Sequence, residues 1–163
     1  MYSFIVNPNA SGGRGERIWR RLEKQLKHLG VPYEAFVTEK TGDARRLACD
    51  LTEHQREPRI LIAVGGDGTV SEVLDGISFC GPVTLGYIPT GSGNDLARSL
   101  RLPKSPSRCL KKILNPKYHK LLDYGVLSYG DHLTHRRFMV STGIGMDAMV
   151  CQDILHSKTK RGL

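Results

Sequence analysis

The sequence has few of the features that would place it among membrane-spanning, disulfide-rich or zinc-thiolate proteins. Its longest apolar stretches, such as residues 60–64, are far shorter than the roughly 20 residues that a membrane-spanning helix needs. The first residues run directly into a strand-like segment rather than into a secretion signal. The four cysteines lie far apart and form no Cys-x-x-Cys pair, which excludes a redox dithiol or zinc knuckle of that pattern. We therefore expect a soluble, cytoplasmic protein with reduced thiols.

Aromatic residues are also scarce, at 7% of the chain, and they do not alternate with basic residues as they do in single-strand nucleic-acid binders. Lys and Arg number 24 against 16 Asp and Glu, so the formal net charge is +8 and an anionic partner is favoured. We expect no nucleic acid among the partners. A basic face could instead hold the protein against anionic lipid, although a solvated face that only aids solubility is the alternative. The basic residues concerned are Arg17, Arg20, Arg21, Lys24, Lys27, Arg98, Arg101, Lys104, Lys111 and Lys112.

Short runs rich in β-branched residues alternate with segments of helical period, which predicts an α/β fold with a parallel sheet. Strands are expected at residues 3–6, 33–37, 59–64 and 83–88. Helices are expected at residues 16–29, 43–54, 69–77, 96–100 and 105–114. The first helix should bury a stripe of Ile18, Leu22, Leu26 and Leu29. The last should begin with Ser105 as its cap and Pro106 at its first position.

The pattern changes near residue 118. Residues 118–129 and 136–142 are extended runs joined by Gly130-Asp131, which predicts an antiparallel hairpin. We expect residues 1–118 to form an α/β ATP-binding domain and residues 119–163 to begin a β-rich C-terminal domain. A short helical run is expected at residues 147–156. So few residues cannot complete a β-rich domain, so we expect the chain to be a piece of a longer protein.

Three glycine-rich loops, at residues 7–13, 65–69 and 89–95, each follow an expected strand. The carboxyl ends of parallel strands meet at one edge of a sheet, where ligands bind. Glycines let backbone amides converge on an anion, and a helix N-terminus adds its dipole, so phosphate is the natural ligand. A solvated turn, a hairpin turn and a helix-capping turn are the respective structural alternatives. Neither a Walker lysine motif nor a G-x-G-x-x-G fingerprint is present.

Asp67 stands out because it lies within the second loop. A carboxylate beside a polyphosphate is repelled unless a divalent cation lies between them, so Asp67 indicates Mg²⁺, held through water. Gly68 and Thr69 lie where the third helix should begin and can donate to phosphate oxygens. Phosphoryl transfer depends on this kind of positioning and charge neutralisation.

Two motifs resemble the diacylglycerol kinase catalytic-domain family, which includes sphingosine and ceramide kinases. They are Gly65-Gly66-Asp67-Gly68-Thr69-Val70-Ser71-Glu72-Val73 with Gly76, and Pro89-Thr90-Gly91-Ser92-Gly93-Asn94-Asp95-Leu96-Ala97-Arg98. The resemblance extends to Asn7-Pro8, Ser11-Gly12, Thr38, residues 42–44 and residues 138–148. It implies a lipid kinase that transfers the γ-phosphoryl group of ATP to a diacylglycerol-like hydroxyl, in a cleft between an ATP-binding domain and a β-rich domain.

The resemblance also implies roles for individual residues. Asp67 would act in catalysis by holding Mg²⁺ and positioning phosphate, while Asn94 and Asp95 would line the acceptor side of the cleft. Thr38 would contact the adenosine side. The full set expected to bind ATP is Asn7, Ser11, Gly12, Thr38, Gly65, Gly66, Asp67, Gly68, Thr69, Val70, Ser71, Glu72, Gly91 and Ser92.

Some features depart from the family pattern. Ser71 and Ser92 stand where the family often has asparagine and threonine, and each keeps a hydrogen-bonding side chain. The resemblance implies that the general base lies in a C-terminal part beyond these residues, so none of the residues here is expected to be the base. Asp123 and Asp147 are candidates for a role in the site, against the alternative of carboxylates in a turn and at a helix start.

Two other functions stay open. An NAD kinase shares the Gly-Gly-Asp-Gly-Thr signature, although the 89–98 motif favours a lipid kinase. A nucleotide-binding fragment that is inactive by itself is the second. The expected partners are ATP and a lipid at a membrane surface, and a homodimer is considered as well. The protein is expected to associate peripherally with the membrane when it acts. The sequence does not indicate which lipid is the acceptor.

Overall fold

A parallel sheet of four strands forms the centre of the computed structural model, which describes residues 1–130, 134–140 and 149. Its strands are β1 (Tyr2–Val6), β2 (Tyr33–Val37), β3 (Arg59–Gly65) and β4 (Val83–Pro89), in the order β2-β1-β3-β4. The four expected strands are thus confirmed to within one residue at each end. Val6 lies opposite Val37 and Val64, and Gly65 lies opposite Pro89, so the carboxyl ends of the strands share one edge.

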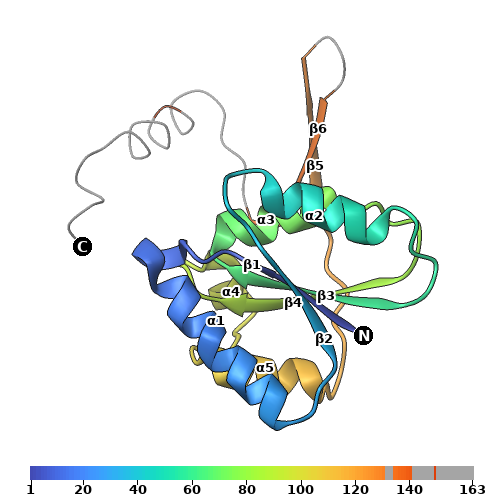
Figure 1. Cartoon of the computed structure of the whole chain (residues 1–163). Coiled ribbons are helices and arrows are strands. Elements are labelled where there is room, and N and C mark those ends of the chain that lie inside the picture. Colours follow the sequence, from blue (N-terminus) through green and yellow to red (C-terminus); the bar gives the residue numbers. More distant parts are fainter. Residues whose placement is uncertain (131–133, 141–148, 150–163) are drawn as a thin grey trace.

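Helices cover both faces of this sheet (Figure 1). Helices α1 (Ala10–His28) and α5 (Pro106–Leu114) pack on one face, and α2 (Asp43–Thr52) and α3 (Asp67–Gly76) pack on the other. A short helix, α4 (Asp95–Ser99), follows β4 after the third glycine-rich loop. The expected α/β class is confirmed. Within the described part of the chain, no helix combines the length and apolar character needed to cross a bilayer.

Alternating strand residues build two separate cores, as expected for a sheet buried on both faces. Residues Phe4, Val6, Ile62, Val64 and Ile88 pack against α1 and α5. On the other face, Ile5, Leu61, Ala63 and Tyr87 pack with residues of α2 and α3. Each core therefore fixes one pair of helices to the sheet.

The first helix differs from the expected stripe at one end. Leu22 and Leu26 are fully buried, but Leu29 exposes 56% of its surface because the helix ends at His28 and Leu29 is its C-terminal cap. Trp19, which the stripe did not include, is buried against Phe4 with 5.2 Å between ring centroids. The expectation for Leu29 was therefore wrong.

Helix boundaries differ from those expected in several places. Helix α1 is assigned from Ala10, but residues 11–13 have positive φ angles of 52°, 66° and 89°, so the first loop interrupts it. Helix α3 begins two residues earlier than expected, at Asp67, and α2 ends two residues earlier, at Thr52. Ser105 does cap α5, with Pro106 at the first position, but its side chain makes no capping hydrogen bond.

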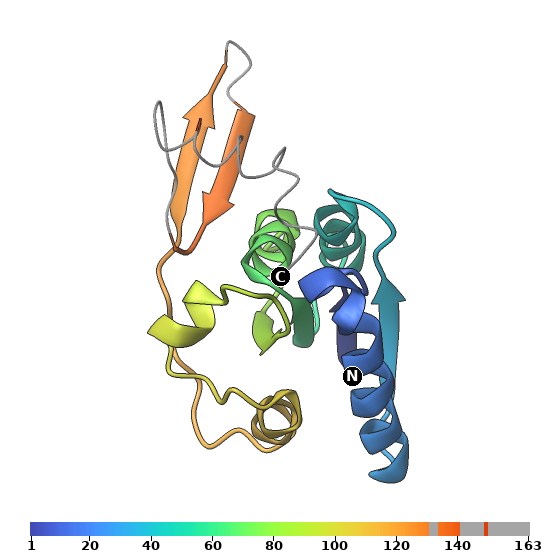
Figure 2. The same ribbon diagram turned by 90° about the vertical axis from the view of Figure 1, so that its left-hand side faces the viewer.

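A separate antiparallel hairpin, β5 (Gly125–Tyr129) and β6 (Thr134–Phe138), extends beyond α2 and α3, away from the parallel sheet (Figure 2). The expected hairpin is therefore present, although its first strand begins at Gly125 and not near residue 118. Asp131, residues 141–142 and the helical run expected at 147–156 lie outside the described residues. The domain boundary near residue 118 stays a prediction.

Helices α2 and α3 approach so closely that Gly76 has no room for a side chain. A Cβ added at Gly76 would lie 2.1 Å from the Arg45 carbonyl oxygen and 2.9 Å from the Ala48 Cβ. We expect Gly76→Ala to lower the free energy of unfolding by about 3 kcal/mol, measured by urea denaturation. Gly68→Ala, where a Cβ would meet nothing within 4 Å, is the matched control and should not destabilise the chain. Equal stability of both variants would contradict this packing argument.

Candidate functional site

The three glycine-rich loops meet at the carboxyl edge of the sheet. The Asn7 amide Nδ2 donates to the Thr69 hydroxyl at 3.0 Å, which joins the first loop to the second. The Ser11 hydroxyl donates to the Thr90 carbonyl at 2.8 Å, which joins the first to the third. The Thr90 N–H donates to the Gly65 carbonyl, also at 2.8 Å, and joins the third to the second. The structure therefore brings together the loops that the sequence indicated separately.

Glycine is required where the second and third loops touch. A Cβ added at Gly91 would lie 2.5 Å from the Gly66 Cα, and one added at Gly66 would lie 3.2 Å from the Gly91 Cα. A Cβ at Gly65 would lie 2.3 Å from the Thr69 hydroxyl. These contacts let two backbone segments lie side by side at the edge where a ligand can approach them.

The second loop leads into the start of α3. Gly66, in an extended conformation, is the N-terminal cap of α3, and as a glycine it has no side chain that could bond to the first amides of the helix. The first amides of an α-helix have no partner within the helix, and with the helix dipole they favour an anion. Gly68 is exposed at this point, Ser71 is half-buried, and Thr69 is buried with its hydroxyl held by Asn7. Val70 packs in the core, and its N–H donates to the Gly66 carbonyl.

Asp67 lies between the second and third loops. Its Oδ1 accepts a hydrogen bond from the Leu96 N–H at 3.2 Å, near the start of α4. Its Oδ2 points toward Gly93, since a Cβ added there would lie 3.3 Å from that oxygen. One carboxylate oxygen thus holds α4 in place while the other faces the third loop. Over residues 1–130, 134–140 and 149, no group of three or more His, Cys, Asp and Glu side chains converges as a metal site.

Asn94 organises the third loop from within. Its φ of 55° lies in the left-handed region, its Oδ1 accepts from the Gly91 N–H at 3.0 Å, and its Nδ2 donates to the Gly91 carbonyl at 2.6 Å. The Tyr87 hydroxyl also donates to Oδ1, at 3.3 Å. Burial, with the nearby charges of Asp67 and Asp95, raises the pKa of Tyr87, so its hydroxyl keeps its proton. Both amide atoms of Asn94 therefore have partners within the loop.

Several other residues that the sequence singled out are more exposed. Asp95 forms an ion pair with Arg98 one turn along α4, and Ser92 is exposed at the tip of the loop. Asp123 is exposed in the segment before β5, and Asp147 lies outside the described residues. Gly12 is exposed with a φ of 66°, and a Cβ there would meet nothing within 4 Å.

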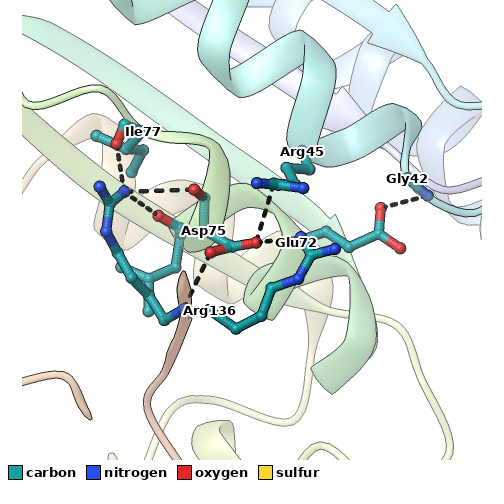
Figure 3. Close-up of polar contacts among 8 residues, drawn as sticks. Gly42, Arg45, Glu72, Asp75, Ile77 and Arg136 are labelled. Carbon is teal, nitrogen blue, oxygen red and sulfur yellow. Dashed lines mark hydrogen bonds and ion pairs between the residues drawn. The ribbon is translucent and has the colours of Figure 1, made fainter. Parts of the chain in front are cut away.

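A turn after β2 flanks the three loops. Thr38 is buried, and both its N–H and its hydroxyl donate to the Val6 carbonyl, at 2.9 and 3.3 Å. Asp43 closes the turn because its Oδ2 accepts from the backbone N–H groups of Lys40 and Glu39, both at 2.9 Å, and these bonds lower its pKa. The Glu72 carboxylate of α3 accepts from the Gly42 N–H at 3.0 Å (Figure 3). Glu72 therefore ties α3 to this turn.

A surface depression of about 470 Å³ adjoins the first loop. Its lining combines apolar with charged side chains, namely Val6, Pro8, Trp19 and Val37 with Glu16, Arg20 and Glu23. A larger depression of about 640 Å³ lies between α2, α3 and β6, and its lining includes Ser71 and Glu72. The residues expected to bind ATP are therefore divided between the three loops and this second depression.

Sequence reasoning missed the structural role of Asp43 and considered Asn94 only as a helix cap or an acceptor-side residue. Both follow a glycine or serine–glycine turn and precede or begin a helix, where Asn and Asp side chains commonly bond to nearby backbone groups. That local signal was available. The particular partners depend on how the loops pack.

The family model for the diacylglycerol kinase catalytic domain matches residues 1–125 of this chain. A Bacillus subtilis (strain 168) protein named "Putative lipid kinase YtlR" is 31% identical over 160 residues, covering 97% of this chain and 52% of the relative. A Staphylococcus saprophyticus diacylglycerol kinase is 38% identical over 100 residues, covering 61% of this chain and 32% of its own.

Solved structures are similar in fold as well as in sequence. The crystal structure of a Bacillus anthracis str. Sterne diacylglycerol kinase superposes with a TM-score of 0.62 and 27% identity, covering 76% of this chain and 44% of that one. The chain therefore spans between 32% and 52% of the length of these relatives.

Proposed function

The chain belongs to the diacylglycerol kinase catalytic domain family, and from this premise we propose that it is the nucleotide-binding part of an ATP-dependent lipid kinase. The reaction is transfer of the γ-phosphoryl group to a diacylglycerol-like hydroxyl. The observation that carries this proposal is the convergence of three glycine-rich loops on the start of α3, at the carboxyl edge of a parallel sheet. The comparisons give lipid kinase names, so the NAD kinase alternative is not favoured.

ATP is proposed to bind with its phosphates against the second loop and the first turn of α3. The amides of residues 66–69 and the helix dipole attract phosphate oxygens, and Gly66 and Gly91 let the second and third loops lie against each other there. Ser11, Gly12 and Ser92 border the same space from the first and third loops. Thr38 follows Val37, which lines the depression beside β1 and β2, and is proposed to face the adenosine side.

Asp67 suits a role in holding Mg²⁺, because Oδ2 faces the third loop while Oδ1 is engaged with Leu96. Mg²⁺ usually keeps several waters and is bound by one or two carboxylates together with substrate phosphates. When bound, it would neutralise charge on the phosphate oxygens during transfer. Asn94 holds the third loop in shape. Asp95, which is exposed and pairs with Arg98, is proposed to line the side where the acceptor hydroxyl arrives.

The lipid acceptor implies contact with a membrane surface. Gln25 Nε2 of α1 donates to the Ser107 hydroxyl of α5 at 2.9 Å, so the basic residues of these two helices lie on neighbouring surfaces. We propose that Lys24, Lys27, Lys111 and Lys112 contribute to peripheral attachment to anionic lipid, at about 1 kcal/mol for each residue near the surface.

The proposal is tested by supplying the full-length parent protein with labelled ATP and Mg²⁺ together with diacylglycerol, sphingosine and NAD. We expect label in a lipid product. Labelled NADP would move the protein to the alternative function, and absence of transfer to every acceptor would contradict a lipid kinase acting on these lipids.

The 163-residue chain by itself is proposed to bind nucleotide without completing the reaction, because it spans about half of the Bacillus subtilis relative. Titration of the chain with a fluorescent ATP analogue should show saturable binding in Mg²⁺. Phosphoryl transfer by the isolated chain would contradict this part of the proposal.

A further inference from the structure

The end of α3 that lies away from the glycine-rich loops is joined to the hairpin by a cluster of charged contacts (Figure 3). The side chain of Asp75 exposes only 9% of its surface, and its Oδ2 pairs with Arg136 at 2.7 Å and with the Arg45 Nε at 3.0 Å. Its Oδ1 accepts from the backbone N–H of Arg137 at 3.0 Å. We name Asp75, Arg45, Arg136 and Arg137 the charged latch. It joins α2, α3 and β6.

Arg137 makes a second set of contacts within the charged latch. Its guanidinium donates to the carbonyl oxygens of Leu74 and Asp75, both at 3.3 Å, and to that of Ile77. These carbonyls lie at the C-terminal end of α3, where the helix has unpaired acceptors and partial negative charge. The arginine therefore caps α3 from a strand that lies about 60 residues later in the sequence.

Two aromatic rings also pack against the guanidinium of Arg137. Its central carbon lies 4.9 Å from the centroid of the Phe79 ring and 5.9 Å from that of Tyr124. The two rings are stacked, with centroids 5.7 Å apart and an interplanar angle of 8°. A planar guanidinium can form several directed hydrogen bonds while it stacks on a ring, which a lysine ammonium cannot do.

Asp75 is charged at neutral pH in this environment. Burial by itself would raise the pKa of Asp75, but the hydrogen bonds from Arg136 and the Arg137 backbone, with the charge of Arg45, lower it below its ordinary value. The side chains of Arg45 and Arg136 are nevertheless 44% and 43% exposed, beside the depression of about 640 Å³. The charged latch is therefore a specific but partly hydrated contact.

Among the described residues, the charged latch supplies most of the polar contacts between the hairpin and the α/β domain. A two-stranded hairpin is marginally stable in water by itself. Many of its residues are exposed, including Val126 and Tyr129 at 53% and 47%. Helix α3 connects the second glycine-rich loop to the charged latch, because its ten residues begin at Asp67 and end at Gly76, next to Asp75.

We propose that Asp75 and Arg137 are positioning residues that fix the hairpin, and with it the acceptor side of the cleft, relative to the phosphate-binding loop at the other end of α3. The statement about the acceptor rests on the proposed lipid kinase function, whereas the docking of the hairpin does not. Phosphoryl transfer requires reacting atoms to be held near attack distance, so a hairpin displaced by about 1 Å slows transfer without removing bound nucleotide.

Hydrogen exchange of the chain tests the docking directly. In Asp75→Asn and in Arg137→Lys, we expect amides of β5 and β6 to exchange about tenfold faster, because a hydrogen bond to a charged group is lost in each variant. Amides of β1, β3 and β4 should exchange as before. Asp50→Asn is the matched control, since Asp50 is an exposed carboxylate of α2 that pairs with Arg46 and not with the charged latch.

Unchanged exchange of the hairpin in both variants, or an unprotected hairpin in the wild-type chain, would overturn the docking. The full-length protein then tests the consequence for catalysis. We expect Asp75→Asn to keep the Kd for ATP within about twofold and to lower kcat for the lipid about tenfold, with partial recovery in Asp75→Glu. An unchanged kcat despite a loosened hairpin would overturn the positioning role. Absence of ATP binding or transfer in the wild-type protein would count against the proposed function, while the exchange result would still decide the docking.

Discussion

Gly91→Ala is expected to weaken ATP binding by about 100-fold, because the new Cβ would force the second and third loops apart. The added atom would lie 2.5 Å from the Gly66 Cα and 2.9 Å from the Asn94 Oδ1, so relief requires a shift of roughly 1 Å in backbone. Such a shift separates the groups that we propose to surround the phosphates. Titration with a fluorescent ATP analogue in Mg²⁺ measures the effect.

Gly81→Ala separates lost binding from lost stability. A Cβ at Gly81 would lie 2.3 Å from the Gln55 carbonyl oxygen, which is a comparable overlap with backbone but between β4 and the end of α2, away from the loops. Both substitutions should lower the free energy of unfolding by about 1–3 kcal/mol. Only Gly91→Ala should lose affinity for ATP in the folded protein. Equal affinities in the two variants would contradict our placement of the phosphates.

Asp67→Asn is expected to make ATP binding in Mg²⁺ weaker by roughly 10–100-fold, as is typical when a group that holds a metal through water is removed. The asparagine keeps an oxygen that can accept from the Leu96 N–H, so the start of α4 should stay in place. The loss should be confined to the Mg²⁺-dependent part of the affinity, because the loop amides and the helix dipole are unchanged. Titrations with and without Mg²⁺ measure this difference.

The control for Asp67→Asn is again Asp50→Asn, which changes the net charge equally at an exposed position of α2. The control should bind ATP with wild-type affinity in Mg²⁺. If Asp67→Asn also bound ATP normally while keeping a native circular dichroism spectrum, Asp67 would have no part in holding Mg²⁺.

Helix α3 is the element on which these predictions converge. Its first turn carries Asp67 and the amides proposed to bind phosphate, its middle carries Glu72, and its end carries Asp75. Glu72 ties it to the turn after β2, and Asp75 ties it to the hairpin. A substitution on this helix can therefore affect three separate parts of the proposed cleft, according to its position.

The amino-acid sequence by itself determined the strands, the α/β class and the three loops. β-branched runs such as residues 60–64 favour buried strands from local preference and burial alone, and the glycine motifs after them are contiguous in sequence. The order of the motifs also sufficed to indicate the family. The proposed roles of individual residues in binding ATP, Mg²⁺ and lipid stay predictions.

Only the tertiary structure decided which side chains meet. The exposure of Leu29 depended on where α1 ended, and the burial of Trp19 depended on packing against Phe4. Asp67 with Leu96, Glu72 with Gly42, and Asp75 with Arg136 join residues 29 to 61 positions apart. A local pattern can indicate that a carboxylate needs a partner, but hydrogen bonds act over about 3 Å, and the partner is fixed only once distant elements have packed.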